Sequence, residues 1–171
     1  MIKSRKSLYS YEILFEHMRK SRQEITDRAI LEEILSTQVI CRLAMVDGER
    51  PYIIPVNYGY REGYLYIHSA PEGKKIDLLG QNQEVCFEVE DRMEITKGEK
   101  ACDWSTRYRS VVGYGTVEIL SDDKSKQQGL EVIMAQHGAP DLTDFDPGNM
   151  SRMVILKIRI TSISGKQSSN Y

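Results

Sequence analysis

The sequence predicts a mainly β protein, an antiparallel barrel of about six strands with helices at its periphery. Two observations support this fold class. Several segments alternate apolar and polar residues at period two, which is the pattern of half-buried strands. Most of these segments are joined by turns as short as Asp47-Gly48 and Arg61-Glu62-Gly63. Such turns leave no room for the crossover connection that a parallel sheet requires.

The chain of 171 residues is long enough for one domain with a buried core. Its composition is ordinary for a globular protein, and its net charge of -2 lacks the positive surplus of proteins that bind nucleic acid or anionic membranes. The cysteines, Cys41, Cys86 and Cys102, show neither metal-binding nor disulfide spacing. No apolar run is long enough to span a membrane. We therefore expect a cytoplasmic protein without a metal site, whose partners include neither nucleic acid nor a membrane.

Residues 1–22 form a distinctly basic N-terminal segment, which we expect to lie outside the single domain formed by residues 23–171. Apolar residues recur in this segment at three- and four-residue steps, and the pattern predicts a short amphipathic helix. These residues are Leu8, Tyr11, Phe15 and Met18. The helix is either an arm that lies on a partner subunit or a frayed extension of the chain.

The domain begins with a helix and a strand hairpin. Thr26 or Asp27 is a suitable N-cap for a helix that runs to Leu35, and a strand follows at residues 41–46. The return strand at residues 52–60 contains Pro55. Because proline cannot donate to a strand ladder, this strand should lie at a sheet edge or carry a bulge.

The next strand, residues 64–69, runs directly into a helix with a cationic start. Ser69 is the expected N-cap, and Glu72 stands three residues later in capping-box spacing. Lys74 and Lys75 then lie near the first turn, where free backbone N–H groups and the helix dipole already favour an anion. This pattern predicts a phosphate site. The alternative is a pair of solvated lysines on an exposed helix.

The remaining segments complete the barrel. In order, they are a strand at residues 85–90, a polar loop at 93–103, a long strand at 104–120, a helix from Asp122 or Asp123 to Gly138, an irregular stretch at 141–149 and a last strand from residue 154. Gly113 and Gly115 predict a sharp bend or a close backbone approach in the long strand. His137, at the end of the helix, is interpreted as a partner of the helix dipole.

Several spaced sequence blocks together resemble the flavin-binding split-barrel proteins related to pyridoxamine 5'-phosphate oxidase. The closest resemblance is to the branch of 5-nitroimidazole resistance (Nim-type) proteins. It extends over residues 24–165 and leaves the basic N-terminal segment outside. The blocks that carry it are EITDR, CRLAMVDGERPYIIPVNYGY, YIHSAPEGKKIDLL, VCFEVE and GEKACDWSTRYRSVVGYGTVEI.

This resemblance implies a six-stranded antiparallel split barrel that forms a homodimer, with FMN, in preference to FAD, bound in clefts at the subunit interface. Arg42, Lys74 and Lys75 would bind the phosphate, and residues 55–58 would lie along the flavin ring. A strand of the other subunit, from Trp104 to Val111, would close the pocket. The full set of implied cofactor-binding residues is Arg42, Leu43, Ala44, Pro55, Val56, Asn57, Tyr58, His68, Ser69, Ala70, Lys74, Lys75, Trp104, Tyr108, Arg109, Ser110 and Val111.

His68 is the candidate catalytic residue, because the resemblance places this titratable side chain next to the cofactor and a substrate. The alternative is a strand histidine that is hydrogen-bonded to a backbone carbonyl. Trp104 and Tyr108 either stack on the flavin or substrate, or pack at a dimer interface without a cofactor. Asp47 stands where full pyridoxamine phosphate oxidases carry a lysine, so oxidation of pyridoxamine phosphate is not expected.

The expected function is that of an FMN-dependent oxidoreductase acting on a small organic acceptor, for example a nitroaromatic. In such an enzyme the flavin carries the electron chemistry and the protein orients it. Three alternatives remain open at this point. The chain is a flavin-binding or redox-sensing protein without turnover, a haem- or F420-binding member of the same fold, or a dimeric structural module with an empty cleft.

Overall fold

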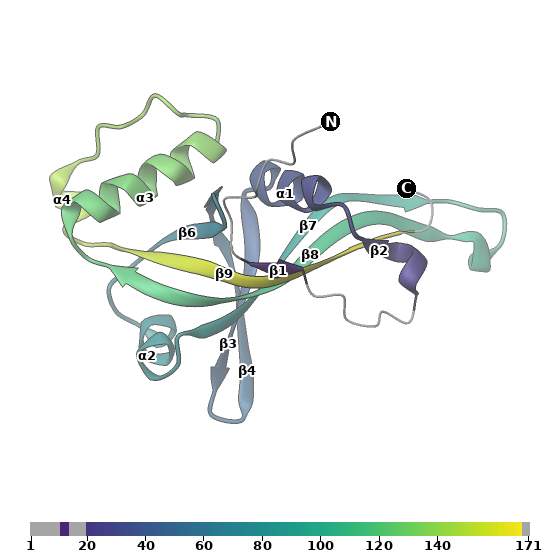
Figure 1. Ribbon diagram of the computed structural model, residues 1–171, viewed down its shortest axis with the longest axis horizontal. Coiled ribbons are helices and arrows are strands. Elements are labelled where there is room, and N and C mark those ends of the chain that lie inside the picture. The colour runs from purple at the N-terminus through teal and green to yellow at the C-terminus, as the bar shows by residue number, and fades with distance from the viewer. Residues whose placement is uncertain (1–10, 14–19, 169–171) are drawn as a thin grey trace, which may run out of the picture.

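One twisted sheet forms the centre of the molecule in a computed structural model, which describes residues 11–13 and 20–168 (Figure 1). Two short strands, β1 (Glu12–Ile13) and β2 (Glu24–Ile25), both pair with β9, and the β1 pairing is parallel. The other strands pair antiparallel in the order β4 (Arg50–Asn57), β3 (Ile40–Asp47), β7 (Glu84–Thr96), β8 (Ser105–Leu120), β9 (Val154–Gln167), β6 (Tyr64–Ser69) and β5 (Gly59–Arg61).

The mainly β, antiparallel architecture with peripheral helices is confirmed, but the expected strand count of six is wrong. The sheet has nine strands within the described residues. One reason is that the predicted return strand breaks at Tyr58, which is fully buried and donates its hydroxyl to the Leu35 carbonyl at 2.8 Å. The break separates β4 from β5. These two strands end the sheet on opposite sides, so hydrogen bonds do not close it into a barrel.

The described part of the N-terminal segment packs on its own chain. Glu12 and Ile13 form a strand, so the predicted helix is wrong at these positions. Tyr11 is buried and donates its hydroxyl to Glu32, while the Arg28 guanidinium lies 4.4 Å from its ring centroid. Burial, followed by the hydrogen bond to Glu32, raises the pKa of Tyr11 to about 12. The other residues of the predicted helix, Leu8, Phe15 and Met18, lie outside the described residues.

Within residues 11–13 and 20–168, four α-helices lie around the sheet: α1 (Arg28–Thr37), α2 (Lys74–Gln81), α3 (Asp123–Gln136) and α4 (Pro147–Met150). Single 3-10 turns lie at η1 (Ser21–Gln23) and η2 (Ala101–Asp103). Asp27 caps α1 and Asp122 caps α3, each one of the two caps that the sequence offers for its helix. None of the described helices is long and apolar enough to cross a membrane.

Helix α2 starts later than predicted. Its N-cap is Gly73, and the hydroxyl of Ser69 donates instead to the Ala70 carbonyl at 2.9 Å. Gly73 has φ 102°, a conformation that glycine adopts without strain. The chain therefore leaves β6, bends through residues 70–73 and enters the helix only at Lys74. The expected capping box at Ser69 and Glu72 does not form.

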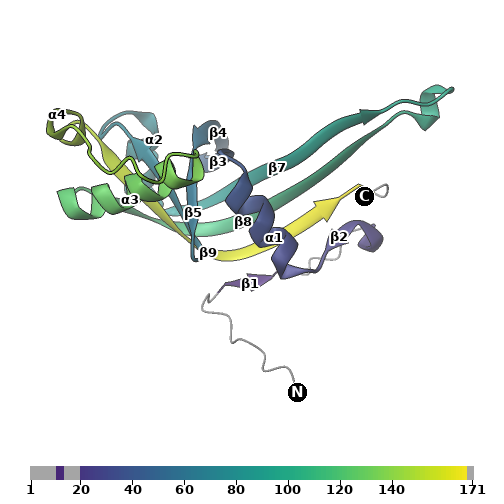
Figure 2. The same cartoon turned by 90° about the horizontal axis from the view of Figure 1, so that it is seen from above.

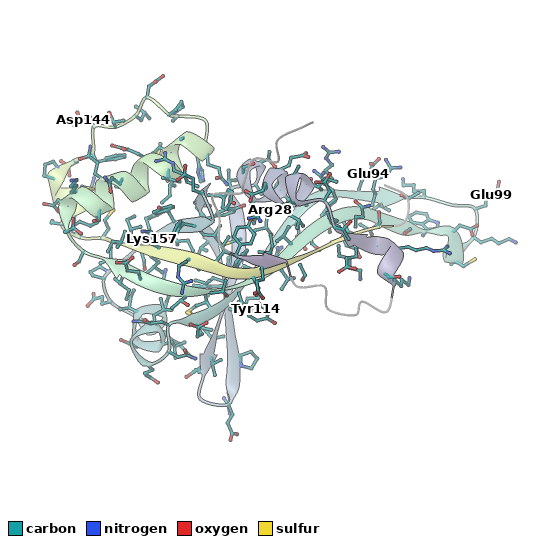
Figure 3. All side chains as sticks on the ribbon, viewed as in Figure 1. Arg28, Glu94, Glu99, Tyr114, Asp144 and Lys157 are labelled. Carbon is teal, nitrogen blue, oxygen red and sulfur yellow. The ribbon has the colours of Figure 1, made fainter. Side chains whose placement is uncertain are left out.

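The hairpin of β7 and β8 is longer than expected and projects from the body of the molecule (Figure 2). The predicted loop at residues 93–103 is too long, because β7 continues to Thr96 after a register shift between Asp91 and Glu94. Glu94 and Glu99 mark this projection (Figure 3). The hairpin and helices α3 and α4 lie at opposite ends of the molecule (Figure 2).

The core has two parts. The larger part lies between the inward faces of the strands and the buried sides of α1 and α2, and includes Leu35, Phe87 and Leu156. The smaller part lies beneath α3, where Leu130 and Ile133 pack on Ile155 of β9. Helix α3 therefore covers a separate, smaller apolar patch.

At the sheet edge, β4 carries Pro55, so the predicted edge position of this strand is confirmed.

Gly113 leaves room for the side chain of its register partner Phe87 on β7, and Gly113→Ala tests this. An added Cβ would lie 2.3 Å from Cζ of Phe87 and 2.9 Å from Cγ2 of Ile163. We expect the free energy of unfolding to fall by about 1–3 kcal/mol, measured by urea denaturation. The control is Gly80→Ala in α2, where an added Cβ meets nothing within 4 Å, and it should be neutral or slightly stabilising. Equal stability of Gly113→Ala and wild type would contradict this packing of the Phe87 ring over Gly113.

Candidate functional site

The start of α2 is a cationic helix N-terminus. Lys74 and Lys75 are its first two residues. Their amides precede the first helical hydrogen bonds, which Ile76 and Asp77 donate to the Gly73 carbonyl at 2.8 and 3.1 Å. An added Cβ at Gly73 would meet no atom within 4 Å, so the space in front of the turn is open. Backbone N–H groups, the helix dipole and two ammonium groups thus favour an anion at one place.

The two lysines have different surroundings. Lys74 Nζ lies 2.6 Å from Oδ2 of Asp47 and 4.9 Å from the centroid of the Tyr52 ring. The hydrogen bond to Asp47 raises the pKa of Lys74. Lys75 is half-buried, and burial lowers its pKa. Lys74 therefore lies against the β3–β4 hairpin, whereas Lys75 is the more desolvated cation of the pair.

Arg42 lies on the outer face of β3, beside two carboxylates of β7. Its Nη1 is 2.9 Å from Oε2 of Glu88 and 3.0 Å from Oε2 of Glu90. The bond to Glu88 and the charge of Glu90 raise the pKa of the guanidinium. Pro55 is its register partner on β4. A phosphate at Arg42 would have to compete with both carboxylates.

The outer face of strands β4, β3, β7 and β8 carries apolar side chains that nothing in the described chain covers. Ala44, Cys86 and Tyr114 form a row across three strands and line a cavity of about 420 Å³. We call it the outer-face cavity. Exposed apolar side chains surround this row, with 54% exposure for Val46, 59% for Ile53 and 46% for Tyr114.

A second cavity, of about 450 Å³, contains two of the predicted site residues, Asn57 and His68. It lies between α3, residues 144–150 and the ends of β4 and β6, and we call it the histidine cavity. His68 lines this cavity and stays accessible to solvent, although neighbouring atoms of the protein partly desolvate its ring. Its pKa is lowered from 6.5 by burial, and further by the charges of Lys75 and His137. His68 is therefore predominantly neutral at pH 7.

Other predicted site residues face the interior. The side chains of Leu43, Tyr58 and Val111 are fully buried in the core, and Ser69 is also buried. Arg109 is buried and donates to Asp91 through Nε at 2.8 Å. Leu43, Tyr58, Ser69 and Val111 can reach a ligand only through their backbone groups. Arg109 is held in an ion pair inside the protomer.

The predicted residues of the partner strand lie away from the cavities. Trp104 follows η2 at the tip of the β7–β8 hairpin, is 51% exposed and donates its indole N–H to the Gly98 carbonyl at 2.9 Å. This tip and α3 lie at opposite ends of the molecule (Figure 2). Tyr108 and Ser110 lie further along β8 and are partly exposed. One protomer brings Asn57 and His68 together, but it does not bring Trp104 to them.

A family model described as pyridoxamine 5'-phosphate oxidase matches residues 27–167. The chain belongs to this family. No curated protein matches it in sequence. Among solved structures, this oxidase-family chain is similar to a candidate 5-nitroimidazole antibiotic resistance protein from Bacteroides thetaiotaomicron, with 29% identity and a TM-score of 0.75 over 84% of this chain and 86% of the other. The resemblance seen in the sequence is confirmed.

Two further solved structures share the fold of the oxidase-family chain at lower identity. A FAD and heme binding protein from Mycobacterium smegmatis has 22% identity and a TM-score of 0.76, covering 86% of this chain and 74% of the other. The flavocytochrome Anf3 from Azotobacter vinelandii has 17% identity and a TM-score of 0.75, covering 89% and 72%. At these identities the comparison establishes the fold alone.

The sequence did not reveal most of the histidine cavity of this oxidase-family protein. His137 was assigned only to the helix end, where its Nδ1 indeed lies 2.8 Å from the Ile133 carbonyl. Phe145, Met150 and Met153 also line the cavity, but they belong to or follow the stretch that was expected to be irregular. The spacing of Leu130, Ile133 and Met134 predicted an apolar side of α3. This spacing was the signal in the sequence for one wall of the histidine cavity.

Lys75→Met in the oxidase-family protein tests the electrostatics at His68. Loss of the nearby cation should raise the pKa of His68, yet leave it below 6.5 because burial is the larger cause. An NMR titration of the imidazole Cε1–H signals measures this. Lys124→Met, an exposed position of α3, serves as the control and should leave the pKa unchanged.

The same pKa shift has a consequence for stability. The unfolded chain binds the His68 proton at higher pH than the folded protein, so folding stability should decrease as the pH falls below about 6.5 and through the folded pKa. A His68 titration midpoint above 6.5 would contradict both expectations.

Proposed function

We propose that this protein is a homodimeric, FMN-binding split-barrel oxidoreductase that acts on a small organic acceptor, with a nitroaromatic as one example. The observation that carries the proposal is the cationic start of α2, at Lys74 and Lys75, near a cavity that contains Asn57 and His68. The charge of Lys75 acts on His68, which supports a common site. Membership of the pyridoxamine 5'-phosphate oxidase family supports the same assignment.

The residues present fit a flavin mononucleotide. The open first turn of α2 suits its phosphate, with Lys75 as the principal cation, because Lys74 and Arg42 already have acidic partners. The outer face at Ala44 and Pro55 suits an apolar ring, and the Asn57 amide can hydrogen-bond the polar edge of that ring. The flavin, when bound, supplies the electron or hydride transfer. The chain's own contribution is to bind and orient it.

His68 is the residue that we assign to proton handling. A neutral imidazole has one N–H donor and one acceptor, so it can hold a proton near a substrate atom or take one up. The lowered pKa keeps this neutral form dominant at pH 7. The apolar walls of the histidine cavity would also exclude water from a ligand there.

The proposed second subunit explains two features of one protomer. The outer face exposes apolar side chains such as Val46 and Ile53, which a partner copy would cover. The projecting β7–β8 hairpin carries Trp104 far from its own histidine cavity, so this residue would reach a site only in a partner. Sedimentation measurements should therefore give the mass of a dimer.

The purified protein tests the proposal directly. We expect yellow protein with flavin absorption bands, and release of FMN on heating, identified by chromatography. A Soret band, the F420 spectrum or an absence of colour would each overturn the FMN assignment. Anaerobic reduction of the flavin, followed by reoxidation with a nitroaromatic, then tests turnover. If the reduced flavin is not reoxidised by an organic acceptor, the oxidoreductase assignment is overturned. The protein would then be a flavin-binding or redox-sensing protein without turnover.

A further inference from the structure

The histidine cavity has the size and the construction of a small-molecule site. Its volume of about 450 Å³ falls in the range typical of ligand pockets, roughly 300–1,000 Å³. One wall is the chain from residue 144 to α4, and Asp144 lies on the loop that passes above α3 (Figure 3). Lys126 Nζ fixes this wall, because it donates to the Met150 carbonyl at 2.8 Å and pairs with Asp123 at 3.0 Å. The cavity is thus a part of the folded structure.

The larger part of its lining is apolar and adaptable. Methionine side chains are flexible and polarisable, and they make favourable contacts with aromatic rings. Phenylalanine offers a face or edge for the same partner. The apolar residues that line the cavity are Leu130, Ile133, Met134, Phe145, Met150 and Met153. This lining fits a compact aromatic ring.

The polar part of the cavity lining combines two acidic residues with histidine and amide groups. His137 Nδ1 lies 2.8 Å from the Ile133 carbonyl, and since a carbonyl can only accept, Nδ1 carries a proton. Asp144 and Asp146 also line the cavity, and Oδ1 of Asp146 accepts the Asn149 N–H at 2.8 Å as the cap of α4. The donors are the amides of Asn57 and Asn149 and the N–H of neutral His68.

The charge of the lining disfavours an anion. Asp144 and Asp146 are acidic, and the lining includes neither lysine nor arginine. Lys75 acts on His68 from α2, which lies outside the lining. An anionic ligand would therefore meet two carboxylates, whereas a cationic or uncharged donor group would find acceptors.

We infer that the histidine cavity binds a compact aromatic compound that carries an N–H or O–H donor and no negative charge. The ring lies among the methionines, Phe145 and Leu130, and the donor group is received on the acidic side of the lining, at Asp144. The assignment of this compound as the reaction partner of the flavin rests on the proposed function. Its binding to the cavity does not.

Three probes of similar shape test the inference: benzylamine, benzoate and toluene. Each is titrated into the full-length protein as purified, and binding is followed by NMR of the methionine methyl and histidine Cε1–H signals. We expect benzylamine to bind at least about tenfold more tightly than benzoate or toluene, since one good hydrogen bond or ion pair accounts for that factor. The shifted signals should include those of Met134 and His137.

Two variants and one control locate the bound probe. Met134→Trp should fill the cavity and abolish benzylamine binding, while Gln128→Trp, at an exposed position of the same helix, should leave it unchanged. Asp144→Asn, at an exposed position that places little demand on folding, should reduce the preference for benzylamine over benzoate. Equal affinities for the three probes, or benzylamine binding that survives Met134→Trp, would overturn the inference.

The visible spectrum of each sample separates this inference from the proposed function. Benzylamine binding by protein that takes up no flavin would support the cavity assignment and overturn the flavin proposal. Flavin-loaded protein that does not bind benzylamine would overturn the cavity assignment and support the flavin proposal. Circular dichroism of Met134→Trp establishes that this variant is folded before its binding is interpreted.

Discussion

Lys75→Met should weaken FMN binding by at least about tenfold, because a charge-assisted hydrogen bond contributes roughly 1.5–3 kcal/mol. Lys75 is half-buried at the first turn of α2, burial lowers its pKa, and no carboxylate of the described residues forms an ion pair with it. Its ammonium group is therefore available to a phosphate. Combined with Lys74→Met, the loss should be larger, but by less than a further factor of about ten, because Asp47 already pairs with Lys74.

Lys74 and Arg42 should each contribute less than Lys75. Lys74 is bound to Asp47 at 2.6 Å, and Arg42 is bound to Glu88 and Glu90. A phosphate that binds Lys74 or Arg42 must displace the carboxylates that already pair with them. The net gain in binding free energy is therefore smaller than at Lys75. Arg42→Ala alone should thus weaken FMN binding less than Lys75→Met does. The measurement is fluorescence quenching of added FMN, titrated with protein from which flavin has been removed.

Lys124→Met is the matched control, since this exposed lysine stands near the start of α3. It should leave FMN affinity unchanged. The ionic strength is held constant across the series, because exposed charges are screened by salt. Unchanged affinity in the Lys74→Met, Lys75→Met double variant would show that the phosphate site has been assigned to the wrong helix.

The sequence predicted those parts of the fold that depend on local chemistry. Asp27 and Asp122 were each one of two candidate caps, because their side chains can satisfy free N–H groups of the first turn. Pro55 indicated an edge strand or a bulge because it lacks an N–H donor, and the strand lies at the edge. Both inferences need only the residue and its neighbours, and the structure bears them out.

Other features depended on contacts that are distant in sequence. Ser69 was an acceptable cap, but Gly73 supplies the positive φ that redirects the chain, so the helix begins at Lys74. The histidine cavity was missed for a similar reason. Residues 141–149 look irregular on their own, and they become a wall because Phe145 and the adjacent Met150 pack on the apolar side of α3 and Lys126 binds the Met150 carbonyl.

Arg109 shows the limit of carrying a role over from a resemblance. By resemblance, its charge and its position on β8 made it a candidate for a cofactor contact. In the structure its side chain is 6% exposed and is bound to Asp91, which is 9% exposed, and to the more exposed Glu33. The hydrogen bond from Arg109 lowers the pKa of Glu33. This arrangement indicates that Arg109 stabilises the fold by joining β7, β8 and α1.

Arg109→Met should therefore lower the free energy of unfolding by about 3–5 kcal/mol, because it leaves the buried carboxylate of Asp91 without its main cationic partner. The control is Arg107→Met on the same strand. Arg107 is 45% exposed and lies 3.8 Å from Glu94, so its removal should change stability by less than about 1 kcal/mol. Urea denaturation at one fixed protein concentration, followed by circular dichroism, measures both variants.

A double variant distinguishes a buried ion pair from a cofactor ligand. Replacing both partners, as in Arg109→Met with Asp91→Leu, removes the unpaired charge, so most of the lost stability should return. Gln38, whose amide lies 3.1 Å from Oδ1 of Asp91, stays near the surface and can bind water instead. If Arg109 instead contacts the flavin, Arg109→Met would reduce FMN affinity with little change in stability, and Asp91→Leu would rescue neither.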